Sequence, residues 1–410
     1  MNREMKHSGV PWLKDIPSNW NVERGKNVLV LQKRPVRESD EVVTCFRDGE
    51  VILRSLRRTE GFTMSDKEIG YQGINEGDIV IHGMDGFAGA MGVSKSTGKG
   101  SPVLVVCSPK YDAIPQYIIY YLRALAMTDV FIALATGIRE RSCDLRWNKI
   151  SELEFILPSS IEQQKIASFL DRKCAEIDEM IALQEKIVEE LKAYRQSVIT
   201  EAVTKGLNPD VPMKDSGVEW IGEIPEHWRI TTIGRLFRVS AGGDAKWDIY
   251  SDKQDNEHPY PVYTNTLDKN QTYAYTSIPV YKGDTITVTG RGDIGRAFYR
   301  KTPFDAIIRL LVLEKRYSLD CRYFAYFINN VIHFFTNSAA IGQLSAVQVV
   351  PYNVCHPSIE EQTDIADYLD TKCTEIDNLI SIKLSKIDSL KEYKKSIIYE
   401  YVTGKKEVIE

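Results

Sequence analysis

The sequence contains one framework twice. Residues 5–20 recur, with substitutions, as residues 213–228, and residues 158–203 recur as residues 357–402. The segments between these repeats share only a skeleton. A duplicated framework that carries two different inserts indicates one protein that makes two different contacts.

The later repeat predicts a long helix in each copy. Its apolar residues are spaced by three or four positions without an intervening proline or glycine, which is typical of a helix with one apolar seam. Pro158-Ser159 and Pro357-Ser358 precede the helices, and Gly206 and Gly404 end them. The two seams comprise Ile166, Leu170, Cys174, Ile177, Ile181, Val188, Leu191, Tyr194 and Val198, and Ile365, Leu369, Cys373, Ile376, Ile380, Ile387, Leu390, Tyr393 and Ile397.

A helix of roughly 40 residues rises about 60 Å, and a single seam of that length cannot bury itself. We therefore expect the two helices to pack on each other within the chain. The alternative is a coiled coil with a second copy of the chain.

The inserts are expected to be two mixed domains in an α+β fold. Strand signals at residues 78–81, 103–106 and 285–288 alternate with helical signals at residues 115–127 and 321–335. The predicted division is a first domain at 1–157, a first long helix at 158–206, a second domain at 207–356 that begins with a connector at 207–225, and a second long helix with a tail at 357–410.

The net charge of −5 does not exclude a nucleic-acid partner. The two predicted long helices carry the acidic excess, so the rest of the chain is nearly neutral and can hold local basic patches. No run of 18 apolar residues occurs and the N-terminal segment is polar. We therefore expect a cytoplasmic protein without a membrane partner.

The seven cysteines include no Cys-x-x-Cys pair. Cys174 and Cys373 occupy equivalent apolar positions in the repeated helix. Cysteines in this pattern are expected to be small buried hydrophobic residues rather than disulfide partners or metal ligands.

A glycine pattern is common to both inserts. Gly77-Asp78 precedes Gly86 and Gly89 with the same spacing as Gly283-Asp284 precedes Gly292 and Gly295. A plain hairpin and a tight loop that approaches a ligand both fit this pattern. The side chains of the two loops differ: the first has Met84, Asp85 and Phe87, with Lys95 and Lys99 beyond, and the second has Arg291, Asp293, Arg296 and Arg300.

A second common stretch precedes each long helix, where Leu145 aligns with Leu344. The first copy carries Arg139, Arg141 and Arg146 there, and the second carries Gln343 and Ser345. Arginine and glutamine can make paired hydrogen bonds to guanine and adenine edges, although an ordinary solvated loop also fits. A third cluster suits phosphate contacts through charge and comprises Arg54, Arg57 and Arg58.

No catalytic motif is recognisable. The chain has no adenosylmethionine-type glycine loop and no Asn-Pro-Pro-Tyr motif, and its six histidines show no metal-ligand spacing. Gly98-Lys99-Gly100 is only superficially similar to a phosphate loop and is expected to be a flexible turn. The sequence therefore predicts a protein without chemistry of its own.

These features together resemble the specificity subunits of type I restriction-modification systems. The resemblance is carried by residues 215–228, by the paired segments 158–178 and 357–377, and by the glycine-centred residues 289–295. It implies a non-catalytic subunit whose two target recognition domains each read one half of a split, asymmetric DNA site. It also implies an internal pseudo-two-fold repeat, in which two long antiparallel helices form a coiled coil that sets the gap between the half-sites.

The resemblance also implies partners. They are double-stranded DNA, two modification subunits that methylate adenine N6 with S-adenosylmethionine, and restriction subunits that use ATP and Mg²⁺, while this chain binds no cofactor or metal. Gln164 and Lys165 are replaced by Thr363 and Asp364 in the second copy. The two helix starts are therefore expected to offer different docking surfaces.

Two other classes of function remain open on the residues alone. A coiled-coil scaffold with protein-binding domains would not bind DNA in a salt-dependent way. A nuclease or methyltransferase with an unrecognised site would be active as the purified chain.

Overall fold

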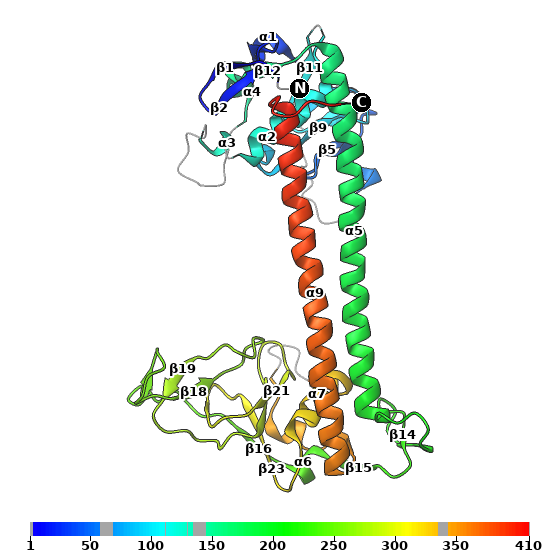
Figure 1. The fold of residues 1–410 in the computed structure, drawn as a ribbon, viewed down its shortest axis with the longest axis vertical. Helices are drawn as coiled ribbons and strands as arrows, with labels where there is room; N and C mark the ends of the chain where they lie inside the picture. Colours follow the sequence, from blue (N-terminus) through cyan, green and yellow to red (C-terminus); the bar gives the residue numbers. More distant parts are fainter. Residues whose placement is uncertain are drawn as a thin grey trace. The chain divides into compact units, whose positions relative to one another are not determined.

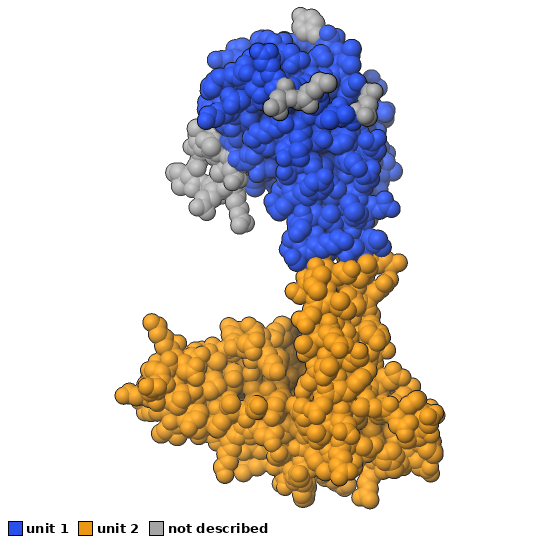
Figure 2. All heavy atoms as spheres, in the orientation of Figure 1, with its two compact units in different colours: residues 1–184, 385–410 blue, residues 185–384 orange. Residues whose placement is uncertain are grey.

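The computed structural model describes residues 3–57, 69–110, 112–128, 130–133, 145–334 and 343–409. They form two compact units, one of residues 1–184 with 385–410 and the other of residues 185–384 (Figure 2). The longest helices, α5 (Ser160–Lys205) and α9 (Ile359–Val402), are each continuous and contribute to both units (Figure 1). Each unit thus combines one insert with part of each long helix in an α+β arrangement.

The first unit is built on a four-stranded antiparallel sheet. Its order is β4-β11-β8-β9, formed by Leu29–Leu31, Leu104–Pro109, Ile79–His82 and Met91–Val93. Four further pairs are β1 (Met5–Val10) with β2 (Leu13–Pro17), β3 (Asn21–Arg24) with β12 (Glu154–Leu157), β5 (Val43–Cys45) with β6 (Val51–Leu53), and β7 (Gln72–Ile74) with β10 (Gly98–Gly100). The shorter helices are α1 (Gly25–Val28), α2 (Pro115–Met127), α3 (Val130–Ala133) and α4 (Trp147–Glu152).

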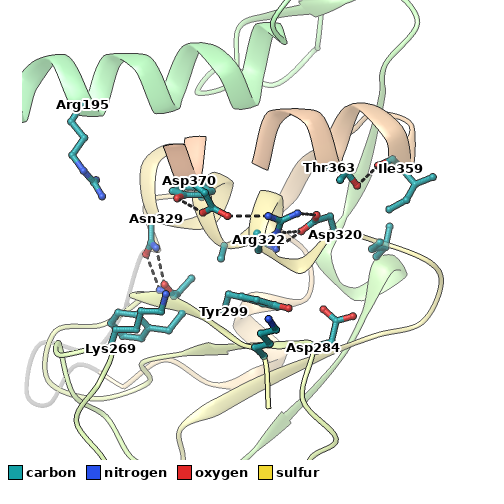
Figure 3. A pocket seen from close by; sticks show the side chains of 16 residues that line it. Arg195, Lys269, Asp284, Tyr299, Asp320, Arg322, Asn329, Ile359, Thr363 and Asp370 are labelled. Atoms are coloured by element: carbon teal, nitrogen blue, oxygen red, sulfur yellow. Dashed lines mark hydrogen bonds and ion pairs between the residues drawn. The ribbon is translucent and has the colours of Figure 1, made fainter. Parts of the chain in front are cut away.

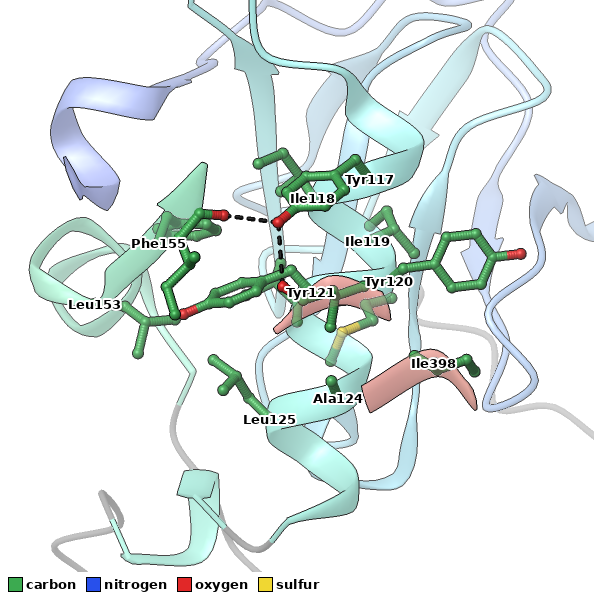
Figure 4. Packing of buried hydrophobic residues seen from close by; sticks show 14 of the residues in the cluster. Tyr117, Ile118, Ile119, Tyr120, Tyr121, Ala124, Leu125, Leu153, Phe155 and Ile398 are labelled. Carbon is green, nitrogen blue, oxygen red and sulfur yellow. Dashed lines mark hydrogen bonds between the residues drawn. The ribbon is translucent and has the colours of Figure 1, made fainter. Parts of the chain in front are cut away.

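Helix α2 anchors the core of the first unit (Figure 4). Most of its side chains are buried, and two tyrosines use their hydroxyl groups to satisfy backbone oxygens. The hydroxyl of Tyr117 donates to the carbonyl of Ile156 at 2.8 Å and lies 3.2 Å from that of Val402, and Tyr121 donates to Glu154 at 2.6 Å. Buried tyrosines with satisfied hydroxyl groups join α2 to β12 and to the end of α9.

The second unit repeats this plan with an added sheet. Its main sheet has the order β16-β23-β20-β21, formed by Phe237–Ala241, Leu311–Lys315, Thr285–Val288 and Ala297–Arg300. The added sheet, β17-β19-β18-β22, is formed by Tyr250–Ser251, Ala274–Thr276, Tyr260–Tyr263 and Asp305–Ala306. The remaining elements are β13 (Met213–Asp215) with β14 (Glu223–Pro225), β15 (Arg229–Thr232) with β24 (Asn353–His356), and the helices α6 (Ile233–Leu236), α7 (Cys321–Val331) and α8 (Ala346–Val349).

The repeated tryptophans make the same contact in each unit. The indole N–H of Trp20 donates to Glu162 at 3.0 Å, and that of Trp228 donates to Glu361 at 3.1 Å. Both rings are fully buried. A buried indole needs an acceptor for its N–H, so the repeated tryptophan and glutamate form one structural pair in each copy.

The repeated glutamines likewise fix the start of each long helix. The side chain of Gln163 donates to the carbonyl of Pro158 and accepts from the backbone N–H of Ile114, both at 2.9 Å. Gln362 makes the equivalent bonds to Pro357 at 2.9 Å and from Asp320 at 3.0 Å. Each glutamine therefore ties the insert to the first turn of a long helix.

Within each unit the long helices lie against each other. In the first unit, Phe169 contacts Tyr401 with ring centroids 4.5 Å apart, and Asp178 pairs with Lys394 at 2.6 Å. Later residues of α5 therefore meet earlier residues of α9, as in an antiparallel pair. In the second unit Arg195 of α5 pairs with Asp377 of α9 at 2.9 Å.

The expected apolar seams are largely buried. Ile166, Leu170, Cys174, Ile177, Val188, Val198, Ile365, Leu369, Cys373, Ile376, Ile387 and Ile397 are buried, and Ile181, Leu191, Ile380 and Leu390 are half-buried. Tyr194 and Tyr393, which the same periodicity includes, are instead exposed at 56% and 53%. Their hydroxyl groups have water available there, which favours a surface position for tyrosine at the edge of a seam.

The expected strands and helices are found, with two differences. The segment Gly98-Lys99-Gly100 is not a flexible turn but strand β10, because its backbone pairs with residues 72–74. Helix α7 ends at Val331, earlier than the expected residue 335.

The six cysteines that the structure describes are buried and unbridged, as expected, while Cys143 lies outside the described residues. Among the residues that the structure describes, no helix is both long enough and apolar enough to cross a bilayer.

Candidate nucleic-acid interface

Two loops of the second unit cross at Arg291. Arg291, in the loop between β20 and β21, forms an isolated antiparallel bridge with Gln343, which precedes α8. Beside it, the backbone N–H of Leu344 donates to the carbonyl of Gly290 at 2.9 Å. The structure thus brings together two residues that the sequence places on separate segments.

The glycine-rich loop is closed by Thr289. Its backbone N–H donates to the carbonyl of Arg296, and its hydroxyl oxygen accepts from the N–H of Arg296, each at 2.9 Å. A Cβ atom on Gly290 would lie 2.9 Å from the carbonyl oxygen of Leu344. Glycine is therefore required where the two loops touch.

The two arginines of this loop are available to a ligand. Arg291 and Arg296 are exposed, and neither guanidinium forms an ion pair with another residue that the structure describes. Gln343 is half-buried beside them. Free guanidinium and amide groups at one place suit base edges or phosphate oxygens.

Ser345 has a structural role in this arrangement. It is the N-cap residue of α8, and its hydroxyl and backbone N–H both donate to the side-chain oxygen of Gln348 at 2.8 Å. This capping box fixes the start of α8 directly after Gln343. The hydroxyl of Ser345 is therefore already engaged.

Arg300 lies in the core instead of at the surface. It is 4% exposed, donates to Thr287 at 3.1 Å and to the carbonyl of Lys269 at 2.6 Å, and lies 3.6 Å from the ring centroid of Tyr263. Burial lowers the pKa of its guanidinium. Because these internal contacts hold the side chain, we no longer include Arg300 among the candidates for DNA contact.

The first unit contains the same crossing with different side chains. There the N–H of Leu145 donates to the carbonyl of Gly83 at 2.9 Å. His82 and Thr289 also occupy equivalent places, since the N–H of His82 bonds to Ala90 as that of Thr289 bonds to Arg296. Gly83 thus corresponds to Gly290, and Met84 stands where the second unit has Arg291.

This correspondence corrects the alignment of the glycine loops. The second copy has one residue more between Gly283 and Gly290 than the first has between Gly77 and Gly83, and one fewer between Gly290 and Gly295. The two changes cancel, so the identical spacing seen in the sequence conceals a shift of one residue.

The basic cluster of the first unit is largely neutralised within the protein. Arg57 pairs with Asp48 and Glu50 and lies over the ring of Phe46 at 4.2 Å, and Lys95 pairs with Glu50 at 2.9 Å. The hydrogen bond from Arg57 holds the pKa of Asp48 below its ordinary value, and that from Lys95 does the same for Glu50. A phosphate at this surface would compete with carboxylates for both cations.

The other candidates of the first unit are dispersed. Arg54 donates to the hydroxyl of Thr44 at 3.1 Å, Lys99 lies in the middle of β10, and the exposed Arg146 is the N-cap residue of α4. Arg58, Arg139 and Arg141 lie outside the described residues. No single basic site in the first unit follows from the described residues.

Two residues that no sequence pattern indicates shape these loops. Asn265 accepts hydrogen bonds from the backbone N–H of Gly290 at 2.7 Å and of Arg291 at 3.3 Å, and so positions the second loop. In the first unit Arg47 pairs with Asp85 at 3.0 Å. Both come from parts of the chain with no motif, so only the fold could reveal them.

A pocket of about 710 Å³ in the second unit contains several carboxylates but is arranged as a structural network (Figure 3). Arg322 of α7 pairs with Asp320, Asp367 and Asp370, at 2.6, 2.6 and 2.9 Å. The pairs with Asp367 and Asp370 join α7 to α9. Nowhere in the described ranges do histidine, cysteine and acidic side chains form a group that could hold a metal ion.

Comparison with known proteins connects this geometry to a family. The family model described as "Type I restriction modification DNA specificity domain" matches residues 225–404. A putative type I restriction enzyme MjaX specificity subunit from Methanocaldococcus jannaschii is 23% identical over 418 residues, covering 95% of this chain and 94% of that protein.

Two solved structures share the fold. One, described as "Structural basis underlying complex assembly and conformational transition of the type I R-M system", has a TM-score of 0.75 at 14% identity and covers 95% of this chain and 99% of its own. The HsdS subunit from Thermoanaerobacter tengcongensis has a TM-score of 0.55 at 15% identity, covering 95% and 98%. The domain match over residues 225–404 and the relative of nearly equal length show that the chain is similar to type I restriction-modification specificity subunits, and it shares the fold of the two solved structures.

Proposed function

We propose that this chain reads a two-part, asymmetric DNA site, with one half-site contacted by each insert. The observation that carries the proposal is the loop crossing, which occurs in both units with the same backbone hydrogen bond but different side chains. The backbone of the crossing is the same in both copies, but one copy has Arg291 and Gln343 and the other has Met84 in place of the arginine. This difference suits recognition of two different sequences.

In the second half-site we assign base contacts to Arg291, Gln343 and Arg296. In the first half-site we assign phosphate contacts to Arg54 and Arg57, which position the DNA without reading it, while Lys95, Lys99 and Arg146 remain predicted DNA contacts. Arg58, Arg139 and Arg141 remain predicted contacts. Ser345 supports the crossing as a helix cap.

The target recognition domains in this proposal are residues 1–157 and 207–356. Residues 158–206 and 357–410 then form an antiparallel coiled coil within a pseudo-two-fold repeat, and this coiled coil keeps the half-sites a fixed distance apart. The antiparallel contacts of Asp178 with Lys394 support this arrangement, as does the burial of the two seams. The coiled coil would then fix the length of the gap between the half-sites, and the base sequence of the gap would not be recognised.

The proposed partners supply the chemistry. Two modification subunits would dock on this chain and methylate adenine N6 with S-adenosylmethionine, and restriction subunits would use ATP and Mg²⁺. The complex would act on DNA in the cytoplasm. Thr363 and Asp364 differ from Gln164 and Lys165 at the equivalent helix start, so the two docking surfaces would differ in charge.

The test is adenine methylation across the genome, read by single-molecule sequencing in cells that express this chain with the modification subunit encoded beside it. The proposal expects a split, asymmetric motif that disappears when this chain is omitted. An assembled complex that produces no motif, and whose DNA binding does not depend on salt, would favour a protein-binding scaffold instead.

A further inference from the structure

The turn that leads into β23 is strained. Ile308 and Arg309 have φ values of 54° and 57°, in the left-handed region that residues with a side chain rarely adopt. The N–H of Leu310 donates to the carbonyl of Ile307 at 3.1 Å and closes the turn. Two consecutive positive φ values are typical of turns occupied by glycine, asparagine or aspartate, so an isoleucine and an arginine here are unusual.

The framework that the two units share does not itself require this strain. The corresponding turn of the first unit is closed by the same bond, from the N–H of Leu104 to the carbonyl of Ser101 at 3.0 Å. Its central residues, Pro102 and Val103, have no positive φ. Strain that is present in one copy and absent from the other indicates a local requirement of the second copy.

Asn265 connects the strained turn to the loop crossing. Its amide nitrogen donates to the carbonyl of Ile308 at 2.7 Å, while its oxygen accepts from Gly290 and Arg291. The carbonyl oxygen of Arg309 lies 3.0 Å from the place of a Cβ atom on Gly290. The backbone of Arg309 is therefore next to the residue that precedes Arg291.

Arg309 is available to bind a ligand at this position. It is exposed, and its guanidinium has no hydrogen bond or ion pair with any other described residue. Val103 occupies the equivalent place in the first unit, because its carbonyl oxygen lies 2.9 Å from the place of a Cβ atom on Gly83. The cation is thus specific to the second unit.

We propose that Arg309 is a specificity-determining residue that contacts a base edge in the second half-site, and that Asn265 is the residue that positions it. This inference rests on the proposed function. A guanidinium can donate two hydrogen bonds to the O6 and N7 acceptors of guanine. The left-handed turn and the Asn265 bond would hold the backbone of Arg309 beside the loop of Arg291 before DNA binds, so that less ordering is needed on binding.

The experiment compares the methylation motifs of three assembled complexes, which contain the wild-type chain, the Arg309→Ala variant or the Arg316→Ala variant. Arg316 is an exposed arginine at the other end of β23 and serves as the matched control. Arg309→Ala should lose roughly 5- to 150-fold of its discrimination at one position of one half-site and leave the other half-site unchanged. Arg316→Ala should match the wild type.

Arg309→Gly separates recognition from folding. It should raise the thermal unfolding temperature, because glycine removes the strain at this residue, and it should relax the same base position as Arg309→Ala. Arg309→Ala keeps the strained backbone and should not raise that temperature.

Asn265→Asp tests the positioning role. The aspartate can still accept from Gly290 and Arg291 but cannot donate to Ile308. We expect it to relax the position read by Arg309 and to keep the one read by Arg291, whatever its added charge does to overall affinity. Relaxation of both positions equally would overturn the positioning role.

An unchanged motif with Arg309→Ala, or an equal weakening on all sequences, would overturn the base contact while leaving the proposed function in place. A wild-type complex that makes no motif would overturn both.

Discussion

Arg291 and Gln343 are paired through an isolated antiparallel bridge at the crossing of two loops. One side chain suits guanine and the other adenine, because each can form paired hydrogen bonds with the base edge. The crossing recurs in the first unit between Leu145 and Gly83. The two units share the backbone of this crossing and differ in its side chains. The side chains would therefore decide which sequence each unit recognises.

Replacement of Arg291 by alanine should relax one base position at a cost of about 1–3 kcal/mol in discrimination. Its guanidinium is exposed and has no ion pair with a described residue, so the free energy of unfolding should change by about 0.5 kcal/mol or less. Competition binding with cognate and singly substituted sites measures the first quantity. Arg57→Ala is the control and should weaken binding to all sequences alike; the same pattern for Arg291→Ala would contradict its assignment.

Replacement of Arg300 by alanine should have the opposite profile. The change removes two hydrogen bonds and leaves a cavity in the core, so the free energy of unfolding should fall by about 2–4 kcal/mol. The folded fraction should keep its base preferences. Urea unfolding and the methylation motif provide the two measurements. Arg296→Ala is the matched exposed control for the unfolding measurement. A stable Arg300→Ala variant with a relaxed motif would restore Arg300 to the interface.

The helices were predictable from the sequence because a regular apolar period extends over many turns, and α5 and α9 begin and end close to the expected proline, serine and glycine residues. The loop register was not predictable. An added residue before Gly290 is offset by a deletion after it, and only hydrogen bonds such as that from Leu344 reveal the shift.

The misassignment of Arg300 has a similar origin. An arginine at the end of a β-rich segment is usually exposed, and the partners that bury this one, Thr287, Lys269 and Tyr263, come from other elements. Asn265 was missed for the same reason, because its two backbone contacts exist only after the loops have come together.

Replacement of Gly290 by alanine should disrupt the crossing. The new Cβ would lie 2.9 Å from the carbonyl oxygen of Leu344 and 3.0 Å from that of Arg309, so the backbone must move. We expect the free energy of unfolding to fall by about 1–3 kcal/mol and discrimination in the second half-site to be lost. Gly243→Ala is the control, because its Cβ would meet nothing within 4 Å. Equal behaviour of the two variants would show that the close approach is unimportant.

The Trp228–Glu361 pair should make part of the stability depend on pH. Burial by itself would raise the pKa of Glu361, but hydrogen bonds from His227, Trp228 and Ser358 hold it below its ordinary value of 4.5. A lowered folded pKa adds stability above pH 4.5 that is lost as the pH falls through the lowered value.

Glu361→Gln should therefore reduce the free energy of unfolding at neutral pH by about 1 kcal/mol or less, since the carboxylate is partly exposed. It should also flatten the decline on acidification. Urea unfolding on both sides of pH 4.5 compares the variant with the wild type. An unchanged acid dependence would mean that other carboxylates dominate it.

Shortening both long helices together should shorten the gap between the half-sites. Removal of residues 182–188 and 381–387 deletes seven residues from each helix, about 10 Å, and keeps the apolar seam in phase because seven residues are close to two turns. It also leaves the pairs Asp178–Lys394 and Arg195–Asp377 between residues that are retained. With base pairs about 3.4 Å apart, the motif should lose about three unread positions while both half-sites persist. Removal of residues 182–188 alone should put the seams out of register and destabilise the chain. A doubly shortened variant with an unchanged gap would show that these helices do not set the spacing.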